Sequence, residues 1–218
     1  MAEDARTPHD KTTAAADGAG VGPDWAAYYR HTLGREPRPL FVKGMAALDA
    51  AGVAPGQAVE IGFGDGTETL ALLDAGWRVI AVDQAHQAEE VLRPRVPAGA
   101  EGRLEVRIAS AADLELPPFD LLYAGFALSF LAPDELRRFW AEVRAMLRPG
   151  GFVVVNVFGV RDTWAGDAFM SFVDRDTVDR MAAGLEVIAI DEEDADGSSF
   201  VGDKHWHVFD IVARRPPG

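Results

Sequence analysis

Residues 58–67 read Ala58-Val59-Glu60-Ile61-Gly62-Phe63-Gly64-Asp65-Gly66-Thr67, a short apolar run with a glutamate, followed by three alternating glycines. A helix-like segment follows at 67–73, and the next apolar run, 79–82, ends in Asp83. Glycine at a strand-to-helix corner permits unusual backbone dihedrals and lets a ligand lie against bare backbone. In a doubly wound sheet such a corner lies at the carboxyl ends of the strands, where nucleotides bind. The stretch therefore predicts a nucleotide-type site on an α/β fold.

The spacing of these residues separates two kinds of nucleotide site. Asp83 lies 21 residues after Gly62, which matches the acidic residue that holds a ribose diol about 20 residues on. A dinucleotide fingerprint reads G-x-G-x-x-G, and Thr67 stands where its third glycine belongs. The sequence has E-x-G-x-G-x-G instead, from Glu60 to Gly66.

This pattern, with Asp83 at the end of the following strand, resembles motif I of the class I S-adenosylmethionine (SAM) dependent methyltransferases. The resemblance implies that SAM is the cofactor, that the glycines approach its methionine part, and that Asp83 holds its ribose. A glycine-rich turn alone is common. Two correctly placed strands and two acidic residues make this one specific.

Strand-like and helix-like segments alternate along the chain, which is typical of an α/β fold with a largely parallel sheet. With the resemblance, the pattern predicts a Rossmann-like, seven-stranded, mostly parallel sheet with a C-terminal antiparallel hairpin and helices on both faces. The expected strands are 58–61, 79–83, 104–109, 119–124, 152–158, 185–191 and 204–214. The expected helices are 38–51, 67–73, 87–92, 133–147 and 175–183.

The last two expected strands are separated only by an acidic segment, 192–202, which we interpret as a turn. A parallel crossover needs a dozen residues or more, usually helical, so these strands are expected to be antiparallel. The helix at 133–147 is expected to end at Pro149-Gly150-Gly151, because proline and glycine terminate helices.

The composition predicts one globular domain, residues 23–218, preceded by a disordered tail, residues 1–22. The chain has 218 residues, 48% hydrophobic and 26% charged, as in an ordinary soluble protein. The tail is polar and rich in small residues, without the apolar region of a signal peptide.

The net charge and the cysteine content limit which binding partners and which cellular compartment we expect. A net charge of −14 argues against attraction to nucleic acid or to anionic membranes. No apolar run reaches the roughly 18 residues of a membrane span. The absence of cysteine excludes disulfides and thiolate metal sites and fits a cytoplasmic protein.

The resemblance also implies which residues surround the cofactor. Ser110 and Ala111 follow the third strand, where relatives often recognise adenine, and Asp113 fits a turn residue as well as a ligand. Phe126 follows the fourth strand, where it is expected to form a wall of the pocket. The expected cofactor-binding residues are Glu60, Gly62, Phe63, Gly64, Gly66, Asp83, Gln84, Ser110, Ala111, Gly125 and Phe126.

Three residues are candidates for catalysis: Tyr29, Arg161 and His205. Tyr29 precedes the first strand, where relatives carry a lid over the pocket. Arg161 follows the fifth strand, where the alternative is a solvated turn with a local ion pair. His205 begins the last strand, and its alternative is a structural histidine. His205 and His207 share one strand face, but no carboxylate partner is evident, so a metal site is not expected.

The acceptor is expected to be a small molecule. Tyr123-Ala124-Gly125-Phe126 lacks the Asn/Asp-Pro-Pro-Tyr signature of many amino methyltransferases that act on nucleobases or glutamine. The segments 159–164 and 204–207 also resemble a bacterial branch of small-molecule methyltransferases near the tellurite-resistance type. The methylated atom, any general base and the oligomeric state are left open by the sequence.

Three alternatives compete with a methyltransferase. A catalytically degenerate SAM-binding regulatory module would bind SAM without forming S-adenosylhomocysteine. A nicotinamide oxidoreductase is opposed by Thr67 and by the lack of a separate substrate domain. A SAM enzyme that transfers another group, such as aminopropyl, is the third.

Overall fold

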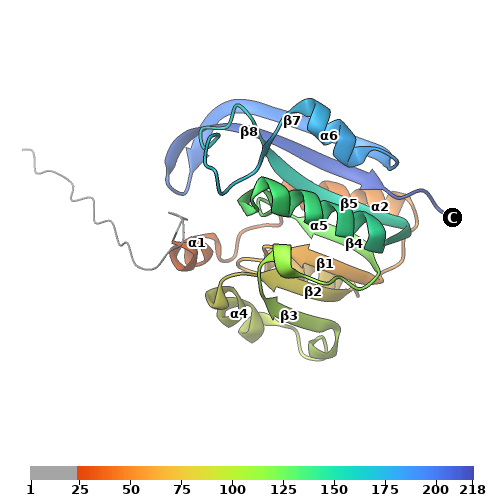
Figure 1. Cartoon of the computed structure of the whole chain (residues 1–218). Helices are drawn as coiled ribbons and strands as arrows, with labels where there is room; N and C mark the ends of the chain where they lie inside the picture. The colour runs from red at the N-terminus through yellow and green to blue at the C-terminus, as the bar shows by residue number, and fades with distance from the viewer. Residues whose placement is uncertain (1–23) are drawn as a thin grey trace, which may run out of the picture.

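The computed structural model describes residues 24–218, so the predicted disordered tail lies outside the described residues. The helices are α1 (Trp25–Thr32), α2 (Pro39–Ala50), α3 (Thr67–Asp74), α4 (His86–Leu92), α5 (Pro133–Met146) and α6 (Arg175–Ala182) (Figure 1). The strands are β1 (Gln57–Ile61), β2 (Arg78–Asp83), β3 (Leu104–Ile108), β4 (Phe119–Ala124), β5 (Leu147–Gly159), β6 (Phe172–Val173), β7 (Glu186–Ser199) and β8 (Gly202–Arg214).

Over residues 24–218 the strands form one sheet in the order β3-β2-β1-β4-β5-β8-β7, with the two-residue β6 beside β5. The strands β1 to β5 pair in parallel, whereas β8 is antiparallel to both β5 and β7. This arrangement confirms the predicted Rossmann-like sheet with a C-terminal antiparallel hairpin. It brings the carboxyl ends of β1, β2, β4 and β5 to one edge, together with the beginning of β8.

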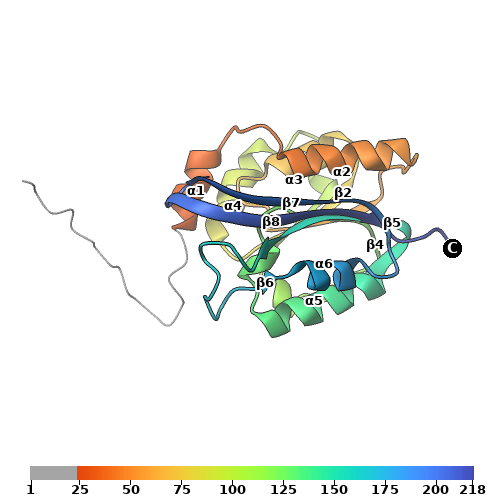
Figure 2. The same ribbon diagram turned by 90° about the horizontal axis from the view of Figure 1, so that it is seen from above.

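Helices cover both faces of the sheet (Figure 2). α2 and α3 lie on one face, where Leu48, Leu72 and Trp77 belong to one buried apolar cluster. α5 and α6 lie on the other face, where Phe139 and Met181 belong to a second cluster. No helix among residues 24–218 combines the length and the apolar character needed to cross a membrane.

The helix α5 ends earlier than its sequence suggests. Its last residue is Met146, one residue before the expected end, and residues 147–151 are already part of β5. Leu147 pairs with Phe119 of β4, and the Gly150 N–H donates to the Arg215 carbonyl at 2.9 Å. Tertiary pairing therefore turns the glycine-containing segment into strand.

The acidic segment 192–202 is not a turn, which corrects the sequence-based expectation. β7 continues to Ser199 and β8 begins at Gly202, so the hairpin turn itself is only Phe200-Val201. β7 is the outer strand of the sheet, where acidic side chains reach solvent and find cationic partners such as Arg161. The charges thus do not prevent strand formation.

We predict that replacement by alanine destabilises the protein more at Gly62, which Ala127 approaches closely, than at Gly52. Both have positive φ (+72° and +67°), but a Cβ on Gly62 would lie 2.5 Å from the Ala127 Cβ, whereas none of the described residues lies within 4 Å at Gly52. Gly52→Ala should cost about 1–2 kcal/mol of unfolding free energy from backbone strain. Gly62→Ala should cost about 1–3 kcal/mol more, because the added methyl overpacks the site.

Urea denaturation of both variants measures this difference. Equal losses would show that Ala127 moves aside at little cost and would contradict the prediction.

Candidate functional site

The residues 62–66, which we call the glycine corner, connect β1 to α3. Gly62, Gly64 and Gly66 all have positive φ, between 53° and 77°, where side chains with a Cβ are strained. The Gly62 N–H donates to the Val82 carbonyl at 2.8 Å, which holds the corner against the end of β2. The corner therefore presents bare backbone at the carboxyl edge of the sheet, as its sequence predicts.

Asp83, at the end of β2, is 7% exposed and binds this corner directly. Its Oδ2 accepts a hydrogen bond from the Gly64 N–H, and its Oδ1 accepts from the Tyr29 hydroxyl and the Ala85 N–H, each at 3.0 Å. The Ala109 N–H donates to the Asp83 carbonyl at 2.9 Å, which brings the loop after β3 to the same place. Gly64, Asp83 and the loop with Ser110 thus converge.

The remaining predicted cofactor residues near Asp83 differ in what they present. Gln84 is exposed, whereas Ala111 and Phe63 are buried, so Phe63 borders the corner only through its backbone. The Ser110 Oγ accepts from the Ala112 N–H at 3.2 Å and thereby caps the short turn that follows.

Glu60, on β1 just before the corner, is 1% exposed. Its Oε2 accepts from the Thr69 hydroxyl at 2.5 Å, and its Oε1 has no partner among residues 24–218. Burial, reinforced by the nearby Glu68 carboxylate, raises the pKa of Glu60 well above its usual range. Burial thus favours the protonated form of Glu60.

An arginine that the sequence analysis did not single out holds the other side of the corner. Arg35 donates to both carboxylate oxygens of Glu68 at 2.6 Å and to Asp65 at 3.2 Å. Burial raises the pKa of Glu68, but the bonds from Arg35 outweigh it and hold that pKa below its usual value. This fork ties the segment before α2 to the first turn of α3.

The helix α1 covers the glycine corner with aromatic side chains. The Tyr29 ring is 4% exposed and approaches to 3.3 Å from where a Cβ on Gly64 would lie. Trp25 stacks on Tyr29, with centroids 6.2 Å apart and an interplanar angle of 22°. Burial first, then the Asp83 carboxylate, raises the pKa of Tyr29 well above its ordinary value, so its hydroxyl remains a donor. Tyr29 thus lies over the glycine corner, and its role in a lid or in catalysis stays a prediction.

Phe126, after β4, is held in a strained conformation beside the corner. Its φ is 57°, and its N–H donates to the Asn156 Oδ1 at 2.6 Å. The Arg38 guanidinium lies 4.9 Å from the centre of its ring and also donates to the Tyr28 hydroxyl at 2.8 Å. Non-glycine residues with positive φ gather at functional sites. Gly125 and Phe126 thus follow the end of β4, and their role as cofactor-binding residues stays a prediction.

Arg161 and His205 belong to a charged network on the β7–β8 hairpin. Arg161 donates to Asp194 at 2.7 Å and to Glu192 at 2.6 Å, and His205 contacts Asp194 and Asp196 at 2.7 and 2.8 Å. Arg161, followed by His205, lowers the pKa of Asp194 to about 2, and Asp194 and Asp196 raise the pKa of His205. The structure brings Arg161 and His205 together but shows no contact of either with the glycine corner among the described residues.

One group in this network has the spacing of a metal site. Ligand atoms of Glu192, Asp194 and His207 lie within 4.8 Å of one another. The Arg161 guanidinium, however, already lies on both carboxylates at 2.6 Å, and His207 contacts Glu192 at 3.0 Å. Arginine and histidine thus already contact these acids, and Glu192 and Asp194 are carboxylate partners that the sequence did not indicate.

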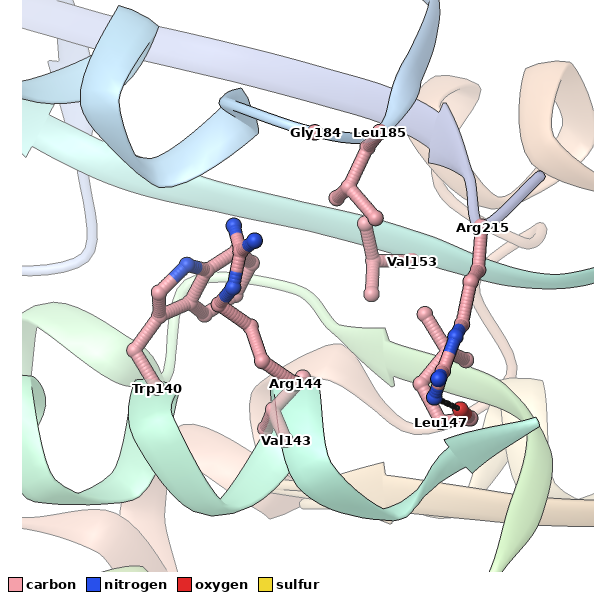
Figure 3. Close-up of a pocket in the computed structure, with 8 residues that line it drawn as sticks. All are labelled: Trp140, Val143, Arg144, Leu147, Val153, Gly184, Leu185 and Arg215. Carbon is pink, nitrogen blue, oxygen red and sulfur yellow. Dashed lines mark hydrogen bonds between the residues drawn. The ribbon is translucent and has the colours of Figure 1, made fainter. Parts of the chain in front are cut away.

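A cavity of about 260 Å³ lies away from the glycine corner, at the beginning of β5 (Figure 3). Because β5 is connected to β1 through parallel strands, its beginning is at the opposite edge of the sheet from the corner. The residues lining this cavity are Trp140, Val143, Arg144, Leu147, Val153, Gly184, Leu185 and Arg215.

Comparison with known proteins agrees with this geometry. Residues 59–155 match the model of the methyltransferase domain family. The chain is 30% identical over 128 residues to a carboxy-S-adenosyl-L-methionine synthase of Pseudomonas putida, covering 54% of this chain and 52% of that protein. The chain thus spans about half the length of the curated relatives it matches.

Two solved structures share the fold. TehB from Haemophilus influenzae has a TM-score of 0.64 at 14% identity, over 80% of this chain and 62% of that one. The 1,6-didemethyltoxoflavin-N1-methyltransferase of Burkholderia thailandensis has a TM-score of 0.59 at 19% identity, over 92% and 93% of the two chains. Residues 59–155 thus match a methyltransferase domain family, and the chain shares its fold with these two solved structures.

We predict that Tyr29 and Asp83 are energetically coupled. Tyr29→Phe removes one of the three donors to a buried carboxylate and should lower the free energy of unfolding by about 1–3 kcal/mol. Asp83→Asn and the double variant complete a double-mutant cycle in urea denaturation, and a coupling of at least about 0.5 kcal/mol is expected. Additive losses would mean that the bond contributes nothing to stability.

Proposed function

We propose that this chain is an enzyme that transfers the methyl group of SAM to a small-molecule acceptor by in-line displacement. The observation that carries the proposal is the glycine corner, three left-handed glycines between the buried Glu60 and the carboxylate of Asp83. The domain match over residues 59–155 supports it.

The residues around the corner fit the chemical groups of SAM. Buried polar atoms without partners among residues 24–218 include the Glu60 Oε1, the Asp65 Oδ2 and the Tyr123 hydroxyl. Such orphaned atoms are costly unless they meet a polar ligand, and the methionine part of SAM carries an ammonium and a carboxylate. Asp83 would hold the ribose hydroxyls, and the backbone at Ser110 and Ala111 would lie beside adenine.

SAM, when bound, supplies an electrophilic methyl group on a sulfonium. The protein's contribution is to align the acceptor with that methyl and to exclude water, an effect of up to about 7–11 kcal/mol. α1 is placed for the second task, because Trp25 and Tyr29 already cover the corner. The Tyr29 hydroxyl donates to the carboxylate that would bind the ribose. Ribose binding would therefore require the Tyr29–Asp83 hydrogen bond to break.

The acceptor is placed beyond Phe126, among the aromatic side chains at the ends of β4 and β5. Phe126 contacts Phe158 and Trp206 at centroid distances of 6.1 and 5.7 Å, and Trp25 contacts Phe130 at 5.1 Å. An aromatic lining suits a small organic acceptor. The Burkholderia relative, by its name, methylates 1,6-didemethyltoxoflavin, which is also a small molecule. The catalytic roles of Tyr29, Arg161 and His205 stay predictions.

Calorimetry with SAM, S-adenosylhomocysteine and NAD(H) tests the cofactor. The first two should bind at one site and NAD(H) should not, because Thr67 replaces the third glycine of a dinucleotide fingerprint. Release of S-adenosylhomocysteine in a metabolite screen separates an enzyme from a degenerate SAM-binding module. NAD(H) binding tighter than SAM binding would overturn the proposal.

We expect Asp83→Ala to weaken S-adenosylhomocysteine binding by about 1–3 kcal/mol, because the ribose hydroxyls lose their acceptor. Tyr29→Phe is the matched control, since it also breaks the Tyr29–Asp83 bond but leaves the carboxylate in place. Its affinity should equal or exceed that of the wild type. If both variants bind as well as the wild type, Asp83 does not hold the ribose.

A further inference from the structure

Lys204, on β8, is a buried cation that the roles proposed so far do not use. Its side chain is 2% exposed, and its Nζ lies 2.6 Å from the Oδ1 of Asp162, which is fully buried. The Nζ also lies 3.5 Å from the ring centre of Trp164, 4.0 Å from that of Trp206 and 4.8 Å from that of Phe158. We call these three rings the aromatic box.

The aromatic box lies on the acceptor side of the proposed site. Phe126, which follows Gly125 at the end of β4, contacts both Trp206 and Phe158 of the box. Phe130, which contacts Trp25 of α1, reaches the box at Phe158 and Trp164, with centroids 6.2 and 6.4 Å apart. Phe126 thus links the box to the end of β4, and Phe130 links it to Trp25 of α1.

Lys204 faces only one other charged group among residues 24–218. Asp162, from the loop after β5, is that group. The neighbouring Arg161 and His205 direct their charges to the acids of β7, and the residue opposite Lys204 in β7 is Gly197, which has no side chain. β5 contributes the Phe158 ring.

Burial is costly for an ammonium, and the Asp162 carboxylate and the three ring faces offset part of that cost. Burial lowers the pKa of Lys204, and the bond to Asp162 only partly opposes this shift. A lysine of this kind releases its proton more easily than an ordinary one. Perturbed, buried titratable groups beside a site are candidates for proton transfer.

We propose that Lys204 is the general base of the reaction, and that the acceptor is a planar aromatic or heteroaromatic molecule with a hydroxyl or ring N–H. Such an acceptor stacks on the half-buried rings of Phe126 and Trp206, and the Trp206 ring moves aside so that the acceptor O–H or N–H reaches the buried Lys204 amine. The inference rests on the proposed function, since it needs a sulfonium methyl donor.

The atoms balance without a further reactant. The acceptor O–H or N–H bond breaks and its proton passes to the neutral Lys204 amine, which becomes an ammonium. The freed electron pair forms the bond to the methyl group, and the pair of the broken carbon–sulfur bond stays on the sulfur. Asp162 then stabilises the new ammonium at 2.6 Å.

The protonation of Lys204 is measurable directly, because the chain has three lysines, Lys11, Lys43 and Lys204. In protein labelled with ¹³C at the lysine ε-carbon, one of three NMR signals should titrate below an ordinary lysine. That signal should vanish in Lys204→Met/Asp162→Asn, a pair that avoids leaving Asp162 as a lone buried charge. A Lys204 signal that titrates like ordinary lysine would overturn the assignment.

The activity test uses phenol, 8-hydroxyquinoline and 4-nitrophenol as acceptors, with cyclohexanol as the saturated control and S-adenosylhomocysteine release as readout. kcat/KM for phenol should rise with pH, because the neutral amine is required, and the rise should follow the pKa of Lys204. Asp162→Asn removes the opposing charge and should move this rise to lower pH. Lys204→Met/Asp162→Asn should lose about 100-fold or more for phenol.

4-Nitrophenol discriminates a base from a structural lysine, because it is largely ionised near neutral pH and needs little help to lose its proton. The double variant should lose much less on 4-nitrophenol than on phenol, whereas a structural defect would lower both equally. Equal losses, an unmoved pH profile, or no transfer to any aromatic probe while S-adenosylhomocysteine binds would overturn the inference. Failure to bind SAM or S-adenosylhomocysteine would instead overturn the proposed function.

Discussion

The carboxylate of Asp83 joins three segments that are far apart in the sequence. One oxygen accepts from Gly64 in the glycine corner, and the other accepts from Tyr29 in α1 and from Ala85 in the chain after β2. A carboxylate buried to this degree is tolerated only when its oxygens receive donors. The corner supplies one of them because glycine allows the left-handed turn that aims the Gly64 N–H at Asp83.

The same edge of the sheet gathers buried acids in a chain that is already strongly acidic. Glu60, Asp65, Glu68 and Asp83 are all buried near the corner. They have different partners: Glu60 accepts from the Thr69 hydroxyl, Glu68 and Asp65 bind Arg35, and Asp83 accepts from neutral donors. Because Arg35 and Tyr29 both precede β1, residues 24–56 contribute to holding three of these four acids in place.

The local parts of the fold could be predicted from the sequence, whereas the parts that depend on distant pairing could not. β1, the glycine corner and Asp83 follow from glycine spacing and from short apolar runs, and they are where they were expected. The strand character of 192–199 depends on its ladder with β8, which reaches from Asp191–Asp210 to Ser199–Gly202. The fork of Arg35 on Glu68 joins residues 33 positions apart, and no local pattern indicates it.

The sequence analysis selected His205 as a candidate and not its neighbour Lys204, although strand alternation gives the two side chains different surroundings. His205 and Lys204 are adjacent and therefore point to opposite faces of β8. His205 meets the acids of β7, and Lys204 turns toward Trp206, two residues on, and toward Trp164. Lysine side chains are ordinarily exposed, so the residue type alone predicts that the Lys204 ammonium group lies in solvent.

The register of the β7–β8 hairpin determines which side chains surround Lys204. Gly197 pairs with Lys204, and a Cβ on Gly197 would lie only 3.1 Å from the Trp206 ring. The glycine therefore leaves the space in which Trp206 lies across the strand and presents its face to the Lys204 ammonium. A shift of one residue in this pairing would send Lys204 and Trp206 together to the acidic face. The surroundings of Lys204 are thus set by the pairing of β7 with β8, strands that a search for cofactor motifs does not consider.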